Sequence, residues 1–268
     1  MPPRDGGALR LRRPAEEPGA PRAILLHGLA GRADVWRPFL DRAPEDWEWW
    51  DVELPWAGMA DPTWAHRGDP VELLAAALDG QHFDLVVAHS FAANLVTEAG
   101  SRGWFRELPA VLVSPFYRPR ADEFDWSSIS YYLNEFHRTF LEAMTLGETA
   151  RFPANYRTWM AHRLRDWVGP YGWMRFFDTY LRSPLVDLST TTAARLVVVG
   201  EQDIAARPED GRALAEALPD GRLARLPGCG HFPMAQDADG FSRAVVDFLT
   251  TLPSERRRHE PEPSMELM

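Results

Sequence analysis

The sequence lacks lysine altogether, and all 29 basic residues among its 268 residues are arginine. Without lysine, no Schiff base can hold pyridoxal phosphate or activate a carbonyl substrate. Nucleotide-binding P-loops and kinase-type sites also need a lysine that contacts the phosphates. These chemistries are excluded, and we attribute the absence itself to a compositional bias toward arginine.

Cysteine and long apolar runs are scarce as well. Cys229 is the only cysteine, so no intrachain disulfide can form, which suits a reducing compartment. No apolar run approaches the roughly 20 residues that a membrane span needs. The N-terminal residues also lack the apolar core of a signal peptide. We therefore expect a cytoplasmic protein without a membrane partner.

Positive charge is in deficit, because 39 acidic residues outnumber the basic ones and give a formal net charge of −10. An acidic surface disfavours nucleic acids and anionic membranes as partners. The basic run Arg256-Arg257-Arg258 belongs to a polar stretch, residues 253–268, that we expect to be a disordered, solubilising tail. The oligomeric state is not indicated.

Short apolar runs alternate with helical patterns along most of the chain. The centres of these runs are rich in Val, Leu and Ile and lack polar alternation, as in strands covered on both faces. Asp69-Pro70-Val71-Glu72 is typical of a helix start, and Gly80 of its end. This alternation predicts an α/β fold with a doubly wound, mostly parallel sheet. The predicted strands are Ala8–Leu11, Ala23–Leu26, Trp49–Leu54, Asp84–Ala88, Ala110–Val113, Ala194–Val199 and Leu223–Leu226.

One stretch departs from this alternation. Residues 116–187 contain helical segments dense in aromatic side chains and no convincing strand. A helical block between two strands of a parallel sheet indicates an inserted cap. We therefore expect a core formed by residues 1–115 and 188–252, with a helical cap between them.

Three residues that could perform nucleophilic catalysis follow predicted strands. Ser90 stands at a strand-to-helix junction, between Ala88 and Ala92, where a sharp elbow would expose its hydroxyl. A serine hydroxyl needs an adjacent base, and His231 in a Gly-x-Gly-His loop can supply one. Asp203 can orient the histidine ring. Their chain order is that of the α/β-hydrolase arrangement.

With these motifs, and with the glycine-rich turn His27-Gly28-Leu29-Ala30-Gly31, the sequence resembles the α/β-hydrolase family from about Ala8 to Leu252. The resemblance implies that Ser90 is the nucleophile, His231 the general base and acid, and Asp203 the orienting carboxylate. It also implies an oxyanion hole formed by the backbone N–H groups of Leu29 and Phe91.

The chain departs from the family pattern at two places. Alanines replace the glycines that commonly flank the nucleophile two residues away on either side. The segment before Ala23 is short, so we expect the first strands of the sheet to be reduced or missing.

Other residues near the predicted active edge carry weaker signals. Trp36, Trp56 and Phe232 are candidate substrate contacts, although aromatic packing explains each of them equally well. We expect His27 to support the glycine-rich turn and His89 to pack away from Ser90. No histidine pair has metal-ligand spacing with a carboxylate, so no metal is predicted.

The leading functional hypothesis is a serine hydrolase, without a cofactor, that cleaves a carboxylic ester, lactone or thioester through an acyl-enzyme. The aromatic cap favours an apolar or aromatic acyl group. Two alternatives remain open at this point. One is a carbon–carbon bond hydrolase, lyase or cyclising enzyme of secondary metabolism that uses the serine and histidine for proton transfer. The other is a non-catalytic small-molecule-binding protein of the same fold.

Overall fold

The computed structural model describes residues 7–253, so the predicted tail beyond Pro253 lies outside the described residues. Seven strands form one sheet in the order β1-β3-β2-β4-β5-β6-β7. Every neighbouring pair is parallel except β1 and β3. The strands are β1 (Arg10–Arg13), β2 (Arg22–Leu26), β3 (Glu48–Asp51), β4 (Leu85–His89), β5 (Ala110–Val113), β6 (Arg195–Gly200) and β7 (Gly221–Leu226). This arrangement confirms the predicted fold class.

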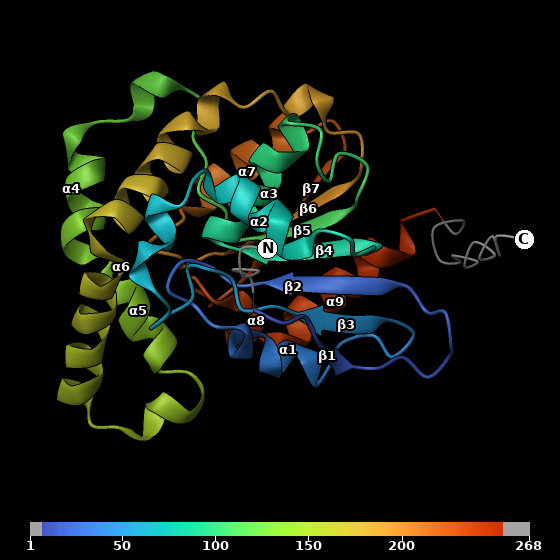
Figure 1. Ribbon diagram of the computed structural model, residues 1–268, viewed down its shortest axis with the longest axis horizontal. Coiled ribbons are helices and arrows are strands. Elements are labelled where there is room, and N and C mark those ends of the chain that lie inside the picture. Colours follow the sequence, from blue (N-terminus) through green and yellow to red (C-terminus); the bar gives the residue numbers. More distant parts are fainter. Residues whose placement is uncertain (1–6, 254–268) are drawn as a thin grey trace, which may run out of the picture.

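Helices cover both faces of the sheet (Figure 1). One face packs against α1 (Arg37–Leu40), α8 (Pro233–Gln236) and α9 (Ala238–Thr250), together with the 3-10 helix η1 (Ala33–Trp36). The other packs against α2 (Pro70–Leu78), α3 (Phe91–Ser101) and α7 (Pro208–Ala217). Helix α2 starts as predicted, because the Asp69 carboxylate accepts a hydrogen bond from the Val71 N–H at 2.8 Å.

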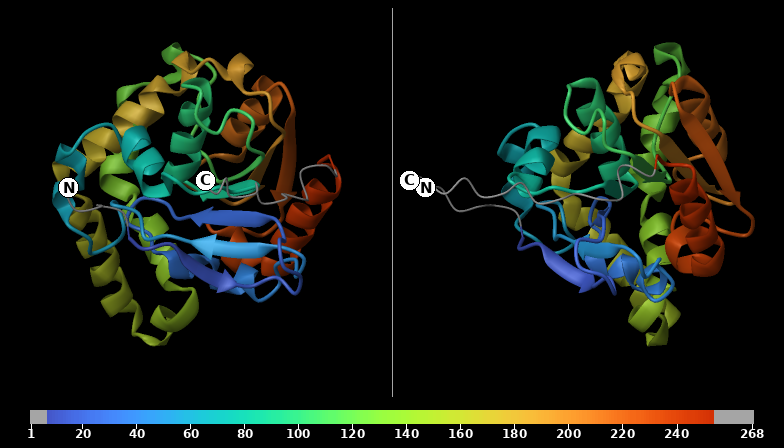
Figure 2. Two further views of the ribbon diagram at one scale, coloured as in Figure 1. Left: turned by 45° about the vertical axis from the view of Figure 1, so that its right-hand side comes forward. Right: turned by 90° about the vertical axis from the view of Figure 1, so that its right-hand side faces the viewer.

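Between β5 and β6 the chain forms helices and turns, which we call the helical insertion (residues 121–190). Its helices are α4 (Trp126–Glu135), α5 (His137–Met144) and α6 (Ala154–Arg182). Its 3-10 turns are η3 (Ala121–Glu123), η4 (Gly147–Arg151), η5 (Ser183–Leu185) and η6 (Leu188–Thr190). The three α-helices lie together beside the edge at which the parallel strands end (Figures 1 and 2). The 3-10 helix η2 (Pro62–His66) packs against α6 there.

Helix α6 is bent in its middle. Gly169 has a φ of 67° and a ψ of 169°, a conformation that is essentially restricted to glycine, and Pro170 follows it. Proline cannot donate the hydrogen bond that would continue the preceding helix. Two helical segments therefore meet at this point.

Three strands differ from their predictions. Strand β7 begins at Gly221, two residues before its predicted start, and is an edge strand whose residues are mostly half-buried. Strand β1 begins two residues later than predicted and is an edge strand with exposed and half-buried residues, not one covered on both faces. Arg10 and Arg12 pair with Asp51 of β3, and Arg13 pairs with Glu45, which accounts for the charged sequence. Strand β3 ends at Asp51 and not at Leu54. The Leu54 N–H donates to the His27 ring at 2.9 Å and not to a neighbouring strand, so the chain has left the sheet by this residue.

Candidate active site

Ser90 occupies a sharp turn between β4 and α3. Its backbone has a φ of 57° and a ψ of −123°, unusual for a residue with a side chain. The Ser90 N–H donates to the Val113 carbonyl at 2.8 Å, and the Ser90 carbonyl accepts from the Ala93 N–H at 2.9 Å. These bonds hold the strained conformation, which is the elbow that the sequence predicted.

The side chains of Ser90, His231 and Asp203 form a continuous chain of hydrogen bonds. The distance from Ser90 Oγ to His231 Nε2 is 3.0 Å, and that from His231 Nδ1 to Asp203 Oδ2 is 2.8 Å. Asp203 Oδ1 accepts from the N–H groups of Ala205 and Ala206 at 2.8 and 2.9 Å. All three side chains are buried. The fold therefore brings together three residues that are up to 141 positions apart.

This arrangement controls the charge on His231. Burial lowers the pKa of the imidazole, but the charge and hydrogen bond of Asp203 and the charge of Glu142 outweigh it and raise the pKa above its ordinary value. With Asp203 on Nδ1, the unprotonated Nε2 faces the Ser90 hydroxyl and can accept its proton.

The glycine-rich turn after β2 lies beside Ser90. The buried His27 ring accepts from the Leu54 N–H at Nε2, so Nδ1 carries the proton and donates to the Gly28 carbonyl at 2.9 Å. A Cβ on Gly28 would lie 2.9 Å from the Ser90 Cβ, which requires glycine there. Within residues 7–253, the N–H groups of Leu29 and Phe91 make no hydrogen bond, so both can serve a ligand.

His89 supports the loop that contains His231. Its Nε2–H donates to the His231 carbonyl at 2.8 Å, and its ring contacts those of His231 and Phe232. Burial, with a contribution from the His231 charge, lowers the pKa of His89 well below its ordinary value. A neutral ring that is bonded to the His231 carbonyl therefore supports the loop.

The three aromatic residues predicted as substrate contacts lie in different places. Trp56 packs edge-on against Phe91, and its indole N–H donates to the His27 carbonyl at 3.2 Å. Phe232 packs edge-on against His231. Trp36 is fully buried against Phe241 on the α9 face of the sheet, where it is a core residue.

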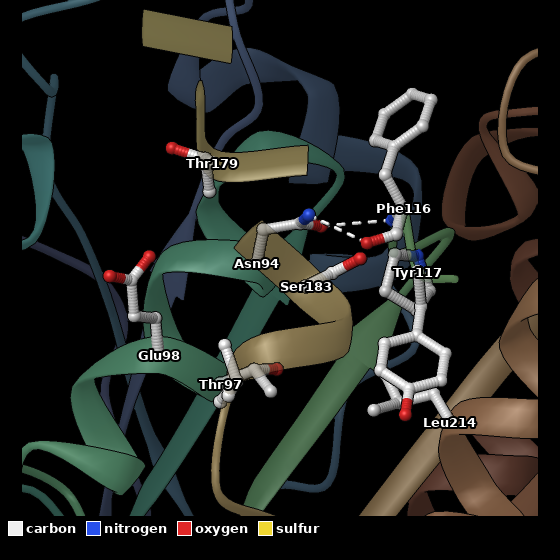
Figure 3. Close-up of a pocket in the computed structure, with 10 residues that line it drawn as sticks. Asn94, Thr97, Glu98, Phe116, Tyr117, Thr179, Ser183 and Leu214 are labelled. Carbon is white, nitrogen blue, oxygen red and sulfur yellow. Dashed lines mark hydrogen bonds between the residues drawn. The ribbon is translucent and has the colours of Figure 1, made fainter. Parts of the chain in front are cut away.

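Two pockets adjoin this region. The first lies between α3 and the segment after β5, and Asn94 bonds both backbone groups of Phe116 at its edge (Figure 3). Ser90, Asp203 and His231 do not line it. The second is apolar and lies against the glycine-rich turn. Its lining includes Leu29, Trp56, Trp64, Trp167 and Val168. Like the first pocket, it is not lined by Ser90, Asp203 or His231.

Sequence reasoning missed three residues of the helical insertion that contact the loops of Asp203 and His231. The Tyr131 and Tyr132 hydroxyls donate to the carbonyls of Ile204 and Ala205 at 2.6 and 2.9 Å. Glu142 Oε1 accepts from the His231 N–H at 2.8 Å. A helical sequence pattern indicates which face is buried, but not which distant loop that face meets.

The described part of the chain contains no cluster of side chains able to hold a metal ion. None of its helices is long and apolar enough to cross a membrane.

Among curated proteins, the chain is similar to the polyketide synthase ThaQ of Burkholderia thailandensis. The two are 25% identical in an alignment 249 residues long, which covers 85% of this chain and 12% of the synthase. The chain thus spans only a small part of that relative.

Solved structures share the fold at low sequence identity. The enol-lactonase from Burkholderia xenovorans superposes with a TM-score of 0.58 at 18% identity, over 90% of this chain and 96% of the lactonase. The meta-cleavage product hydrolase CumD superposes with a TM-score of 0.64 at 16% identity, over 92% of this chain and 99% of that hydrolase.

A model of the alpha/beta hydrolase family matches residues 23–244, which run from β2 into α9 and include Ser90, Asp203 and His231. The parallel sheet and the order of these three residues agree with that match. The chain therefore belongs to the alpha/beta hydrolase family.

Proposed function

We propose that this hydrolase cleaves a carboxylic ester, lactone or thioester through an acyl-enzyme on Ser90. The observation that carries the proposal is the hydrogen-bond chain from Ser90 through His231 to Asp203, with Ser90 on a strained elbow. A serine activated in this way attacks acyl carbons.

In the first half-reaction, Ser90 Oγ forms a bond to the carbonyl carbon while its proton passes to His231 Nε2. Asp203 stabilises the resulting imidazolium. The N–H groups of Leu29 and Phe91 bind the oxyanion, and one such donor typically lowers the barrier by about 3–4 kcal/mol. The bond to the leaving oxygen or sulfur then breaks, and His231 returns the proton to that atom.

In the second half-reaction, water attacks the acyl carbon and gives a proton to His231. The ester bond to Ser90 breaks, Ser90 Oγ recovers its proton, and the free acid leaves. The largely apolar lining of the pocket at Leu29, Trp56 and Trp64, beside one of the two residues with oxyanion donors, supports an apolar acyl group. The similarity to part of a polyketide synthase supports an acyl substrate of polyketide type.

A fluorophosphonate probe tests the nucleophile, because it phosphonylates activated serines. We expect the probe to label the wild-type protein and to spare the Ser90→Ala variant. Ser114→Ala is the matched control, since Ser114 also follows a strand with a positive φ but lies outside the hydrogen-bond chain. Labelling that persists in Ser90→Ala would contradict the proposal.

Turnover of p-nitrophenyl esters of varied chain length separates this proposal from its alternatives. We expect a burst of p-nitrophenol followed by steady turnover. Labelled Ser90 without ester turnover would instead favour carbon–carbon bond cleavage or elimination. Absence of both labelling and turnover would favour a binding protein.

A further inference from the structure

Helix α4 of the helical insertion contacts the turn that contains Asp203. Tyr131 and Tyr132 donate their hydroxyl protons to the consecutive carbonyls of Ile204 and Ala205. The N–H groups of the same turn bind Asp203 Oδ1. Both polar sides of the turn are thus fixed, one by the carboxylate itself and the other by α4.

Helix α5 contacts the loop that contains His231. Glu142 Oε1 accepts the His231 N–H and the Gln236 side-chain N–H, each at 2.8 Å. Gln236 Oε1 in turn accepts the Gly230 N–H at 2.9 Å. One carboxylate and one amide therefore bind successive backbone donors of the loop.

Gly230 makes this approach possible. A Cβ at position 230 would lie 2.2 Å from Glu142 Oε1, so any other residue would push the carboxylate away. The Gly-x-Gly-His sequence thus fits a carboxylate supplied by a segment 89 residues earlier in the chain.

We infer that the helical insertion positions the histidine that transfers protons and the carboxylate that orients it, with Glu142 as the positioning residue for His231 and Tyr132 as that for Asp203. Neither side chain contacts the Ser90 hydroxyl, so each acts through the loop that it holds. This inference rests on the proposed serine hydrolase function.

Glu142 also adds a second negative charge near the imidazole. Its carboxyl faces His231 and Asp203, the Gln236 amide, and the Cys229 thiol, whose pKa is raised by burial and by the charges of Asp237 and Glu142. Burial raises the pKa of Glu142 itself, while His231 and Gln236 oppose that shift. In its charged form, Glu142 stabilises the imidazolium that forms when Ser90 loses its proton.

The pH dependence of fluorophosphonate labelling isolates the charge of Glu142. Labelling requires neutral His231, so its acid midpoint follows the pKa of that imidazole. Glu142→Gln keeps an acceptor for the His231 N–H but removes the charge. We expect the labelling midpoint to move to lower pH and the maximal labelling rate to fall several-fold.

Glu142→Asp separates the charge of Glu142 from its hydrogen bond to the His231 loop, because it keeps the charge and shortens the reach of the carboxylate. We expect a midpoint close to that of the wild type and a labelling rate about as low as that of Glu142→Gln. This variant also serves if Glu142→Gln folds poorly, as judged by thermal unfolding. A wild-type rate and midpoint in either well-folded variant would overturn the role of Glu142.

Tyr132→Phe tests the Asp203 loop without changing any charge near His231. We expect kcat for p-nitrophenyl butyrate to fall several-fold with little change in KM, and the labelling midpoint to stay at its wild-type value. Tyr156→Phe is the control, because Tyr156 is exposed on α6 and its ring contacts are with Phe152 and Trp159. Equal kcat in Tyr132→Phe and the wild type would overturn the role of Tyr132.

The failure of this inference is distinct from failure of the proposed function. If the wild-type protein is not labelled at Ser90, the hydrolase proposal itself fails. If Ser90 is labelled and none of the three variants changes the rate or its pH dependence, the hydrolase proposal stands and the positioning role is wrong.

Discussion

The methyl groups of Ala88 and Ala92 are fully buried on either side of the Ser90 elbow. Family members commonly have glycine at both positions, and the sequence left the effect of this exchange open. The elbow nevertheless reaches a positive φ at Ser90, with its hydrogen bonds to Val113 and Ala93 intact. Alanine is therefore compatible with this turn, and the two methyl groups add to the packing of α3 on the sheet.

At this scale we predict that Ala92→Gly lowers stability and leaves reactivity unchanged. Glycine near a helix start costs up to about 1 kcal/mol in conformational entropy, and loss of a buried methyl group costs about as much again. Chemical denaturation should therefore show a loss of about 1–2 kcal/mol, while the fluorophosphonate labelling rate stays within a factor of two. A large loss of labelling in a well-folded variant would mean that the alanine methyl positions Ser90.

The residues of the predicted site could be found from sequence because each follows a strand. Ser90, Asp203 and His231 come after β4, β6 and β7, whose carboxyl ends meet at one edge of the sheet. Trp36 could not be placed in this way, because an aromatic residue near a predicted loop can turn to either face of the sheet. The structure puts it in the core with Phe241.

Among the secondary-structure elements, β1 shows what an edge strand requires. It pairs with β3 through Asp51, which is fully buried and bonded to Arg10 and Arg12. Charged residues on an edge strand also oppose pairing with other chains. The buried carboxylate lies under the two arginines, so the strand joins the sheet through ion pairs as well as through its backbone.

We predict that Asp51→Asn destabilises the protein by about 1–3 kcal/mol, because it leaves two guanidinium groups without their shared carboxylate. The cost stays moderate since both arginines reach solvent. Urea denaturation measures the change. Asp34→Asn is the matched control, because Asp34 also pairs with Arg12 but is 69% exposed, and its loss should change stability by less than about 0.5 kcal/mol. Equal effects in the two variants would show that burial of the pair contributes nothing.

The other elements differ in how well the sequence predicts them. Strands β4, β5 and β6 are buried at every position, so continuous apolar runs mark them clearly. Strand β3 ends early because of the Leu54–His27 hydrogen bond, which joins residues 27 positions apart. Contacts of this kind depend on the folded chain, and no local pattern indicates them.

For the molecule as a whole, Asp210 links stability to pH. Burial raises the pKa of its carboxyl to about 7, although Arg118 opposes the shift from 3.6 Å away. Its folded pKa lies above its ordinary value, so the folded state binds the proton more tightly than the unfolded state. The contribution of Asp210 protonation to the free energy of unfolding is therefore fully present below about pH 4 and is lost as pH rises toward about 7.

Asp210→Asn should remove this dependence. We expect the melting temperature of the wild-type protein to fall more between pH 5 and pH 8 than that of the variant. The variant should be the more stable of the two at pH 8, by a few kcal/mol at most. An equal fall in melting temperature in the two proteins across this range would contradict the role of Asp210. The effects of His89 and His231 cancel from the comparison, because both histidines are present in both proteins.

The hydrogen bonds from α4 and α5 to the loops of Asp203 and His231 also bear on how such proteins can be recombined. An insertion placed between two strands looks like a module that could be exchanged for another to change specificity. Here the donor sequence would have to supply hydroxyls and a carboxylate at the positions of Tyr131, Tyr132 and Glu142. A chimera that keeps this chain's core and grafts a foreign insertion should therefore include those three side chains in its design.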